Sequence, residues 1–139
     1  MNKISKALIS VSDKRNLETL LKELRKYNIE IISTGGTYKF IKEKNYACTE
    51  ISKYTNFPEI LDGRVKTLHP KIHGGLLADI NKDNHRKQLK QNDISQINLV
   101  IVNLYPFENK LIEDKEPFDE MIENIDIGGP SILRSASKN

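Results

Sequence analysis

Ile97–Leu104, with the sequence INLVIVNL, is the most strand-like run of the chain. A nearly continuous apolar run of this length is typical of a parallel strand that helices cover on both faces. The run therefore predicts a central strand of a parallel sheet, and Tyr105-Pro106-Phe107 marks its end.

Before this strand, short apolar runs alternate with helical patterns. The leucines at positions 17, 20, 21 and 24 form one apolar stripe, which predicts a helix. The expected order is strand Ala7–Val11, helix Asn16–Tyr27, strand Glu30–Ser33, helix Tyr38–Lys44 and strand Ala47–Ile51. This alternation predicts an α/β fold with three layers, in which a doubly wound, mainly parallel sheet carries helices on both faces.

The rest of the chain has weaker patterns. Ser52–Gly63 is expected to be irregular, because it contains a proline and ends in an Asp-Gly turn signal. Gly75–Asp79 is expected to be a short helix or strand, and Asp83–Asn92 and Phe118–Asn124 have helical character. A last helix is expected from Pro130 onward, because proline is favoured at the first helical position.

Gly63–Gly75, GRVKTLHPKIHGG, brings together the side chains of Arg64, Lys66, His69, Lys71 and His73. The proline in its middle would break a helix interior and is poorly suited to a central strand. The stretch is therefore predicted to be a shaped loop that faces a ligand, with a solvated basic loop as the plainer alternative.

Length and composition limit the classes of protein that the chain can represent. The chain has 139 residues, which suits one domain, and a net charge of +3, which is too small to indicate nucleic-acid binding. It has no signal-peptide pattern and no apolar run long enough to span a membrane, so a cytoplasmic protein without membrane contact is expected. Because Cys48 is the one cysteine, no internal disulfide is possible.

Polar and glycine-rich segments follow the predicted strands. In open α/β sheets, ligands bind outside the carboxyl ends of the strands, so these segments are expected to meet. They contribute Ser10, Ser12, Lys14, Ser33–Thr37, Asn103, Tyr105, Asp126, Gly128 and Gly129. Ser33–Thr37, STGGT, combines hydroxyls and backbone N–H groups at a helix start, which favours a phosphate, although a tight strand–helix turn would explain it equally well.

Several other residues have a structural reading beside the functional one. His69 and His73 have the spacing of a helical zinc pair, but Pro70 argues against that helix, so no metal site is predicted. Cys48 is read as a small buried apolar residue rather than as a nucleophile. Tyr105 reads equally well as a core aromatic residue, and Lys138 as a surface lysine.

Five motifs together resemble a known family. They are SVSDK at 10–14, STGGT at 33–37, GRVKTLHPKIHGG at 63–75, NLYPF at 103–107 and DIGGPSILRSASKN at 126–139. They resemble the IMP cyclohydrolase region of the bifunctional purine biosynthesis proteins, which join phosphoribosylaminoimidazolecarboxamide (AICAR) formyltransferase to IMP cyclohydrolase. STGGT by itself is shared by the wider methylglyoxal-synthase-like superfamily. The resemblance implies that residues 1–139 form a methylglyoxal-synthase-like cyclohydrolase domain truncated at its C-terminal end, with the formyltransferase domain absent.

The resemblance implies dehydrative closure of 5-formyl-AICAR to IMP, the last step of de novo purine biosynthesis, without cofactor or metal. It implies 10-formyltetrahydrofolate as the donor for the absent domain and a homodimer for the full-length protein. The implied catalytic residues are Lys66, Tyr105, Asp126 and Lys138. The implied substrate-binding residues are Ser10, Ser12, Lys14, Ser33, Thr34, Gly35, Gly36, Thr37, Arg64, Thr67, Asn103, Leu104, Ile127, Gly128 and Gly129.

Two alternatives stay open on the sequence. A regulatory nucleotide-binding module, similar to the allosteric domain of carbamoyl phosphate synthetase, would share the phosphate segment but would need no reacting lysines. A methylglyoxal synthase, a lyase that acts on a triose phosphate, would share STGGT but not GRVKTLHPKIHGG.

Overall fold

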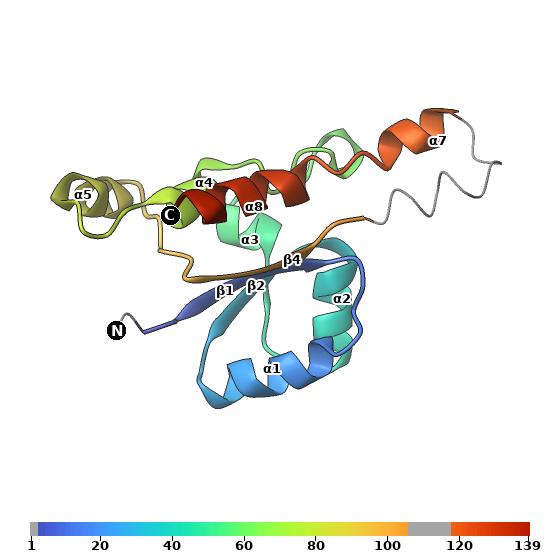
Figure 1. The fold of residues 1–139 in the computed structure, drawn as a ribbon, viewed down its shortest axis with the longest axis horizontal. Helices are drawn as coiled ribbons and strands as arrows, with labels where there is room; N and C mark the ends of the chain where they lie inside the picture. Colours follow the sequence, from blue (N-terminus) through green and yellow to red (C-terminus); the bar gives the residue numbers. More distant parts are fainter. Residues whose placement is uncertain (1–2, 106–117) are drawn as a thin grey trace.

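A four-stranded parallel sheet forms the middle layer of the chain (Figure 1). The structure is a computed structural model that describes residues 3–105 and 118–139. The strands lie in the order β3-β2-β1-β4, and every neighbouring pair is parallel. Their bounds are Lys6–Val11 for β1, Glu30–Ser33 for β2, Thr49–Glu50 for β3 and Leu99–Asn103 for β4.

Helices cover both faces of this sheet (Figure 1). One face packs against α1 (Leu17–Lys26) and α2 (Gly35–Glu43), and the other against α3 (Ile51–Thr55), α4 (Pro70–Leu77) and α8 (Gly128–Lys138). Residues that alternate along β1 serve the two cores, since Ala7 and Ile9 join one buried cluster and Leu8 joins the other. The predicted three-layer, doubly wound fold is therefore confirmed.

The remaining described elements are shorter or lie outside these layers. They are the 3₁₀ turn η1 (Leu61–Gly63), α5 (Asp83–Gln91) and α7 (Phe118–Glu123). No helix within residues 3–105 or 118–139 is long and apolar enough to cross a membrane.

The prediction that Ile97–Leu104 is a central strand is wrong in one respect. Strand β4 lies at the edge of the described sheet, where it pairs with β1. Its apolar side chains are nevertheless covered on both faces, because Leu99 and Ile101 pack against one core and Val100 and Val102 against the other. A continuous apolar run therefore predicts that both faces of a strand are packed, and it does not predict whether the strand is central or at an edge.

The prediction that Gly63–Gly75 is a loop throughout is also wrong, because α4 begins at Pro70. Proline occupies the first turn of this helix, where its missing N–H removes no helical hydrogen bond. The His69 Nδ1 atom accepts a hydrogen bond from the Lys71 N–H at 3.1 Å and so caps the helix. The Gly74–Gly75 pair consequently lies inside α4.

Two helices that border the functional segments begin earlier than predicted. Helix α2 starts at Gly35 rather than at Tyr38, and α8 starts at Gly128 rather than at Pro130. Both glycine pairs are thus the first residues of helices. Their backbone N–H groups belong to the turn in which such groups have no helical partner.

Candidate functional site

A cavity of ≈ 780 Å³ lies at the carboxyl ends of β1 and β4, beside the start of α2. Helix α1, which follows β1, and helix α8, which comes after β4 in the chain, pack on opposite faces of the sheet. Open α/β sheets bind ligands at such a switch point. The lining residues are Ser10, Val11, Ser12, Lys14, Thr34, Gly35, Gly36, Thr37, Asp62, Gly63, Arg64, Lys66, Thr67, Asn103, Tyr105, Ile122, Glu123, Asn124, Ile125, Asp126, Ile127, Gly128, Gly129 and Ile132.

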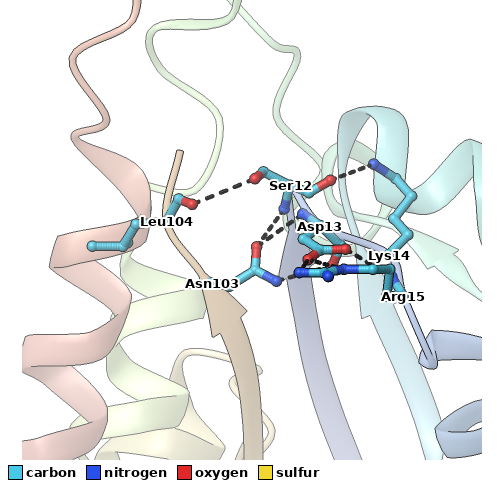
Figure 2. A network of polar contacts seen from close by, with 6 residues as sticks. All are labelled: Ser12, Asp13, Lys14, Arg15, Asn103 and Leu104. Atoms are coloured by element: carbon cyan, nitrogen blue, oxygen red, sulfur yellow. Dashed lines mark hydrogen bonds and ion pairs between the residues drawn. The ribbon is translucent and has the colours of Figure 1, made fainter. Parts of the chain in front are cut away.

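The Asn103 carboxamide joins the ends of β1 and β4 (Figure 2). Its Oδ1 atom accepts hydrogen bonds from the N–H groups of Ser12 at 2.6 Å and Asp13 at 3.2 Å. Its Nδ2 atom donates to the Asp13 carbonyl at 2.9 Å. The Ser12 hydroxyl adds a longer bond of 3.4 Å to the Leu104 carbonyl, so the turn after β1 is tied to β4 at several points.

Two lysine ammonium groups converge on the first turn of α2. A Cβ atom built on Gly36 would lie 3.8 Å from Lys14 Nζ, and one built on Gly35 would lie 3.9 Å from Lys66 Nζ. Gly35 has a φ of 54°, in the left-handed region that glycine tolerates best. Free N–H groups, a positive helix end and two cations together favour an anion.

Thr34 adds a polar group to this corner of the cavity. The residue is 6% exposed and lines the cavity. Its buried Oγ1 atom has no hydrogen-bond partner among the described residues. Buried hydroxyl groups are normally paired, so an unpaired one that borders a cavity is consistent with a ligand partner.

The neighbouring hydroxyl groups have structural roles. The Ser33 hydroxyl is fully buried and donates to the Ile9 carbonyl at 2.7 Å. The Thr37 hydroxyl donates to the Val11 carbonyl at 2.8 Å and accepts from the Val11 N–H at 3.0 Å. Ser33 does not line the cavity, and its hydroxyl joins β2 to β1, so its substrate contact stays a prediction that the cavity lining does not support.

The basic loop closes one side of the cavity through two ion pairs. The Arg64 guanidinium donates to both carboxylate oxygens of Glu123 in α7, one at 3.2 Å and the other closer. These hydrogen bonds raise the pKa of Arg64 and lower the pKa of Glu123. Lys66 Nζ lies 3.4 Å from the Glu59 carboxylate.

The start of α8 forms a wall of the cavity beside the basic loop. Asp126 Oδ1 accepts a hydrogen bond from the Gly129 N–H at 2.9 Å and thereby caps the helix. A Cβ atom on Gly128 would lie 2.6 Å from the Thr67 hydroxyl oxygen, so glycine allows the basic loop to approach the helix closely. One carboxylate oxygen of Asp126 therefore has a structural role at the start of α8.

The structure brings most of the residues predicted from sequence to one cavity. The exceptions are Ser33, Leu104 and Lys138. Leu104 contributes its carbonyl to the Ser12 hydroxyl rather than a side chain to the lining. Lys138 ends α8 and borders a separate, shallower hollow with Leu77, about 15 Å along the helix from Gly128. The structure therefore does not bring Lys138 to the cavity that Lys66 lines, and its catalytic role stays a prediction.

The sequence reading missed three acidic residues at or beside the cavity. Asp62 and Glu123 line it, and Glu59 pairs with Lys66 just outside it. In the sequence, Asp62 is part of an Asp-Gly turn signal, which its left-handed φ of 53° fits. Glu59 and Glu123 carry no sequence signal, because a glutamate in an irregular or helical segment is usually solvated.

Two residues weighed for other chemistry have local roles in the structure. His73 Nδ1 is 2.8 Å from the Ser135 hydroxyl, and within the described residues no group of three or more His, Cys, Asp or Glu side chains could hold a metal ion. Burial raises the pKa of the half-buried Cys48 thiol to about 12, which keeps it protonated and unreactive.

Comparison with known proteins identifies the class to which this fold and site belong. The family model of the MGS-like domain matches residues 16–131, and the chain belongs to that family. The structure is similar to the crystal structure of ForH, with a TM-score of 0.81 and 32% sequence identity over 97% of this chain and 68% of that one.

More specific similarities are to curated bifunctional purine biosynthesis proteins named PurH. The chain is 57% identical over 136 residues to the one from Chlorobium chlorochromatii (strain CaD3) and 54% identical over 136 residues to the one from Bacillus subtilis (strain 168). Each alignment covers 98% of this chain but only 26% or 27% of the relative. The resemblance to this group that the motifs indicate is thus confirmed.

Proposed function

We propose that this chain carries the IMP cyclohydrolase step of purine biosynthesis, the dehydrative ring closure of 5-formyl-AICAR to IMP. One observation carries the proposal: residues from all five motifs that resemble this family line a single cavity at the switch point of the sheet. The similarity to bifunctional purine biosynthesis proteins supports the pathway, and the cavity supports a phosphorylated ligand.

The proposed orientation follows from the charges around the cavity. The phosphate would lie against Thr34 and the first turn of α2, close to the ammonium group of Lys14. The base would then extend toward the opposite wall, where Tyr105 and Asp126 line the cavity. The Lys66 ammonium group lies near both Gly35 and Gly63 and lines the same cavity.

Ring closure forms one bond and releases one water molecule. The carboxamide nitrogen attacks the formyl carbon, loses a proton and leaves an alkoxide on the former formyl oxygen. That oxygen takes up the proton lost by the carboxamide nitrogen and a second proton lost by the formamido nitrogen. It departs as water when the C=N bond to the formamido nitrogen forms. Electrostatic stabilisation of the alkoxide is a role that the Lys66 ammonium group could fill. Tyr105 and Asp126 are the candidates for proton transfer within the cavity.

The direct test is the appearance of IMP absorbance when 5-formyl-AICAR is added to the chain, with a full-length relative as the positive control. Lys66→Ala is expected to lower kcat/KM by roughly 100-fold, as loss of a group that stabilises a developing oxyanion does. Lys39→Ala, an exposed lysine of α2, is the matched control. If the full-length relative forms IMP and the wild-type chain does not, the assignment is contradicted. Equal turnover by Lys66→Ala and Lys39→Ala would contradict the role of Lys66.

Two other functions are separated by the same assay. A regulatory nucleotide-binding module would bind IMP without converting 5-formyl-AICAR, and a methylglyoxal-synthase-type lyase would convert a triose phosphate instead. The phosphate corner around Gly35 suits all three, since it recognises only the phosphate. The similarity to purine biosynthesis proteins favours the cyclohydrolase.

The proposal extends to the longer relatives of the chain. Formyl transfer to AICAR from 10-formyltetrahydrofolate would belong to the part of those proteins that the chain does not cover, and no step above depends on it. The proposed setting is a homodimer of the whole protein in the cytoplasm, acting on a small nucleotide without nucleic acid or membrane as a partner. Cyclisation itself would proceed without a cofactor or metal.

A further inference from the structure

Two glutamates form ion pairs with cationic side chains of the cavity. Glu123 engages Arg64 through both carboxylate oxygens, with the Nε–Oε2 distance at 3.2 Å and the second contact shorter. A guanidinium group binds a phosphate through the same pair of parallel hydrogen bonds. A ligand phosphate that used the fork of Arg64 would therefore have to displace Glu123.

Glu59 has the same relation to Lys66. Its Oε1 atom is 3.4 Å from Lys66 Nζ, and its carboxylate lies where a side chain at Gly63 would otherwise project. The Lys66 ammonium group is in turn 3.5 Å from the Cβ position of Gly63. The left-handed turn through Gly63 thus leaves room for Glu59 to reach a lysine that also faces the first turn of α2.

Lys14 provides a contrast within the same cavity. Its Nζ atom donates to the Ser12 carbonyl at 3.1 Å and forms no ion pair within the described residues. The site thus keeps one lysine without a carboxylate partner and two cations in ion pairs. Exposed ion pairs are weak, so they can be exchanged for a ligand that offers more charge.

We propose that Glu59 and Glu123 are carboxylates that compete with the ligand for Lys66 and Arg64, so that only a ligand with a strong negative charge displaces them. This rests on the proposed function, in which the ligand is a nucleoside monophosphate. Its phosphate, a dianion for most molecules at neutral pH, takes over cations that the carboxylates hold. Because Lys66 and Arg64 are already paired, a neutral nucleoside gains nothing from them.

The test measures IMP affinity by isothermal titration calorimetry for the wild-type chain, Glu59→Gln, Glu123→Gln and the double variant. Each glutamine keeps the size of the side chain and removes the competing charge. Each single substitution is expected to tighten IMP binding by roughly two- to fivefold, the range that an exposed ion pair supports. Inosine, which lacks the phosphate, is expected to bind all four proteins equally.

Asp62→Asn is the matched control. Asp62 lines the same cavity and acts on Arg64 through its charge, but it forms no ion pair within the described residues, so its loss changes local charge without breaking a direct contact to a cation. Asparagine also suits its left-handed backbone. Direct competition predicts that Asp62→Asn tightens IMP binding by less than either glutamine variant, whereas equal effects would show general repulsion and overturn the proposal.

A double-mutant measurement further separates direct competition for Arg64 from general charge repulsion. In an Arg64→Ala background, Glu123→Gln is expected to lose its effect on IMP affinity, because no guanidinium group is left to release. An undiminished effect would overturn the role of Glu123. If the wild-type chain and the variants all fail to bind IMP, the proposed function falls with the inference. If the wild type binds and the glutamine variants bind no tighter, only the inference falls.

Discussion

Asn103 at the end of β4 holds Ser12 at the end of β1, with Asn103 Oδ1 2.6 Å from the Ser12 backbone nitrogen (Figure 2). The same carboxamide accepts from one backbone group of Asp13 and donates to another. One side chain thus supplies both donor and acceptor across the switch point of the sheet. Asn103 acts on the site by fixing the turn that carries Ser12 and Lys14.

Asn103→Ala should therefore both loosen the fold and weaken ligand binding. The substitution removes three hydrogen bonds from a partly exposed site, and we expect the free energy of unfolding to fall by about 1–2 kcal/mol. Urea denaturation followed by circular dichroism measures this change. Asn98→Ala, which loses bonds to Ser5 and Lys6 at the opposite end of the same strands, is the control, because it should lower stability without changing IMP affinity.

Strand β1 and helix α1 are the parts of this fold that the sequence predicts well. The side chains of β1 alternate between two cores, and the leucines of α1 form one stripe. Both are local patterns that only one kind of element explains. The edge position of β4 could not be predicted, because its apolar run depends on helices above and below the sheet. Pro70 was equally ambiguous, because a proline ends a helix or begins one according to the capping of the residue before it.

Some features of the candidate site could likewise be predicted from the sequence, and others could not. Segments at strand ends could be placed together by topology, and most of their residues do line the cavity. Neighbouring hydroxyls could not be separated, since the sequence does not tell which of Ser33 and Thr34 points into the sheet. Glu123 was missed because its partner Arg64 is far away in the sequence.

Gly75 predicts a strong effect of a small substitution. A Cβ atom there would lie 2.6 Å from the Ser95 carbonyl oxygen and 3.2 Å from a side-chain atom of Ile97, and the backbone cannot move aside easily. Gly75→Ala should lower the free energy of unfolding by about 1–3 kcal/mol, measured by urea denaturation. Gly36→Ala is the contrast, since its nearest neighbour would be Lys14 Nζ at 3.8 Å. Equal stability of the two variants would show that α4 can shift.

His73 predicts a pH dependence of stability. Burial lowers its pKa below the usual value of 6.5, although a backbone contact with Thr67 opposes this. The unfolded chain therefore binds a proton at a higher pH than the folded chain, and stability should fall as the pH drops through and below 6.5. His73→Gln should flatten this slope in urea midpoints measured between pH 7.5 and about 5. An unchanged slope would assign the dependence to other groups.

Thr34 and Thr37 are buried threonines at the start of α2, and they predict opposite outcomes of the same substitution. The Thr37 hydroxyl bonds both backbone groups of Val11, so Thr37→Val should cost about 1–3 kcal/mol of unfolding free energy by leaving them unpaired. The Thr34 hydroxyl has no partner among the described residues, so Thr34→Val should leave the ligand-free chain equally stable or more stable.

Although Thr34→Val should not destabilise the ligand-free chain, it should weaken ligand binding. If its hydroxyl faces the phosphate of a bound nucleotide, Thr34→Val should weaken IMP binding by roughly 10- to 100-fold, the value of one hydrogen bond to a charged group. Denaturation and calorimetry on one preparation provide both numbers. A stability gain together with an affinity loss would show that the unpaired hydroxyl is kept for the ligand. A stability loss with unchanged affinity would instead show that the hydroxyl serves the fold, and the phosphate would then have to be placed elsewhere in the cavity.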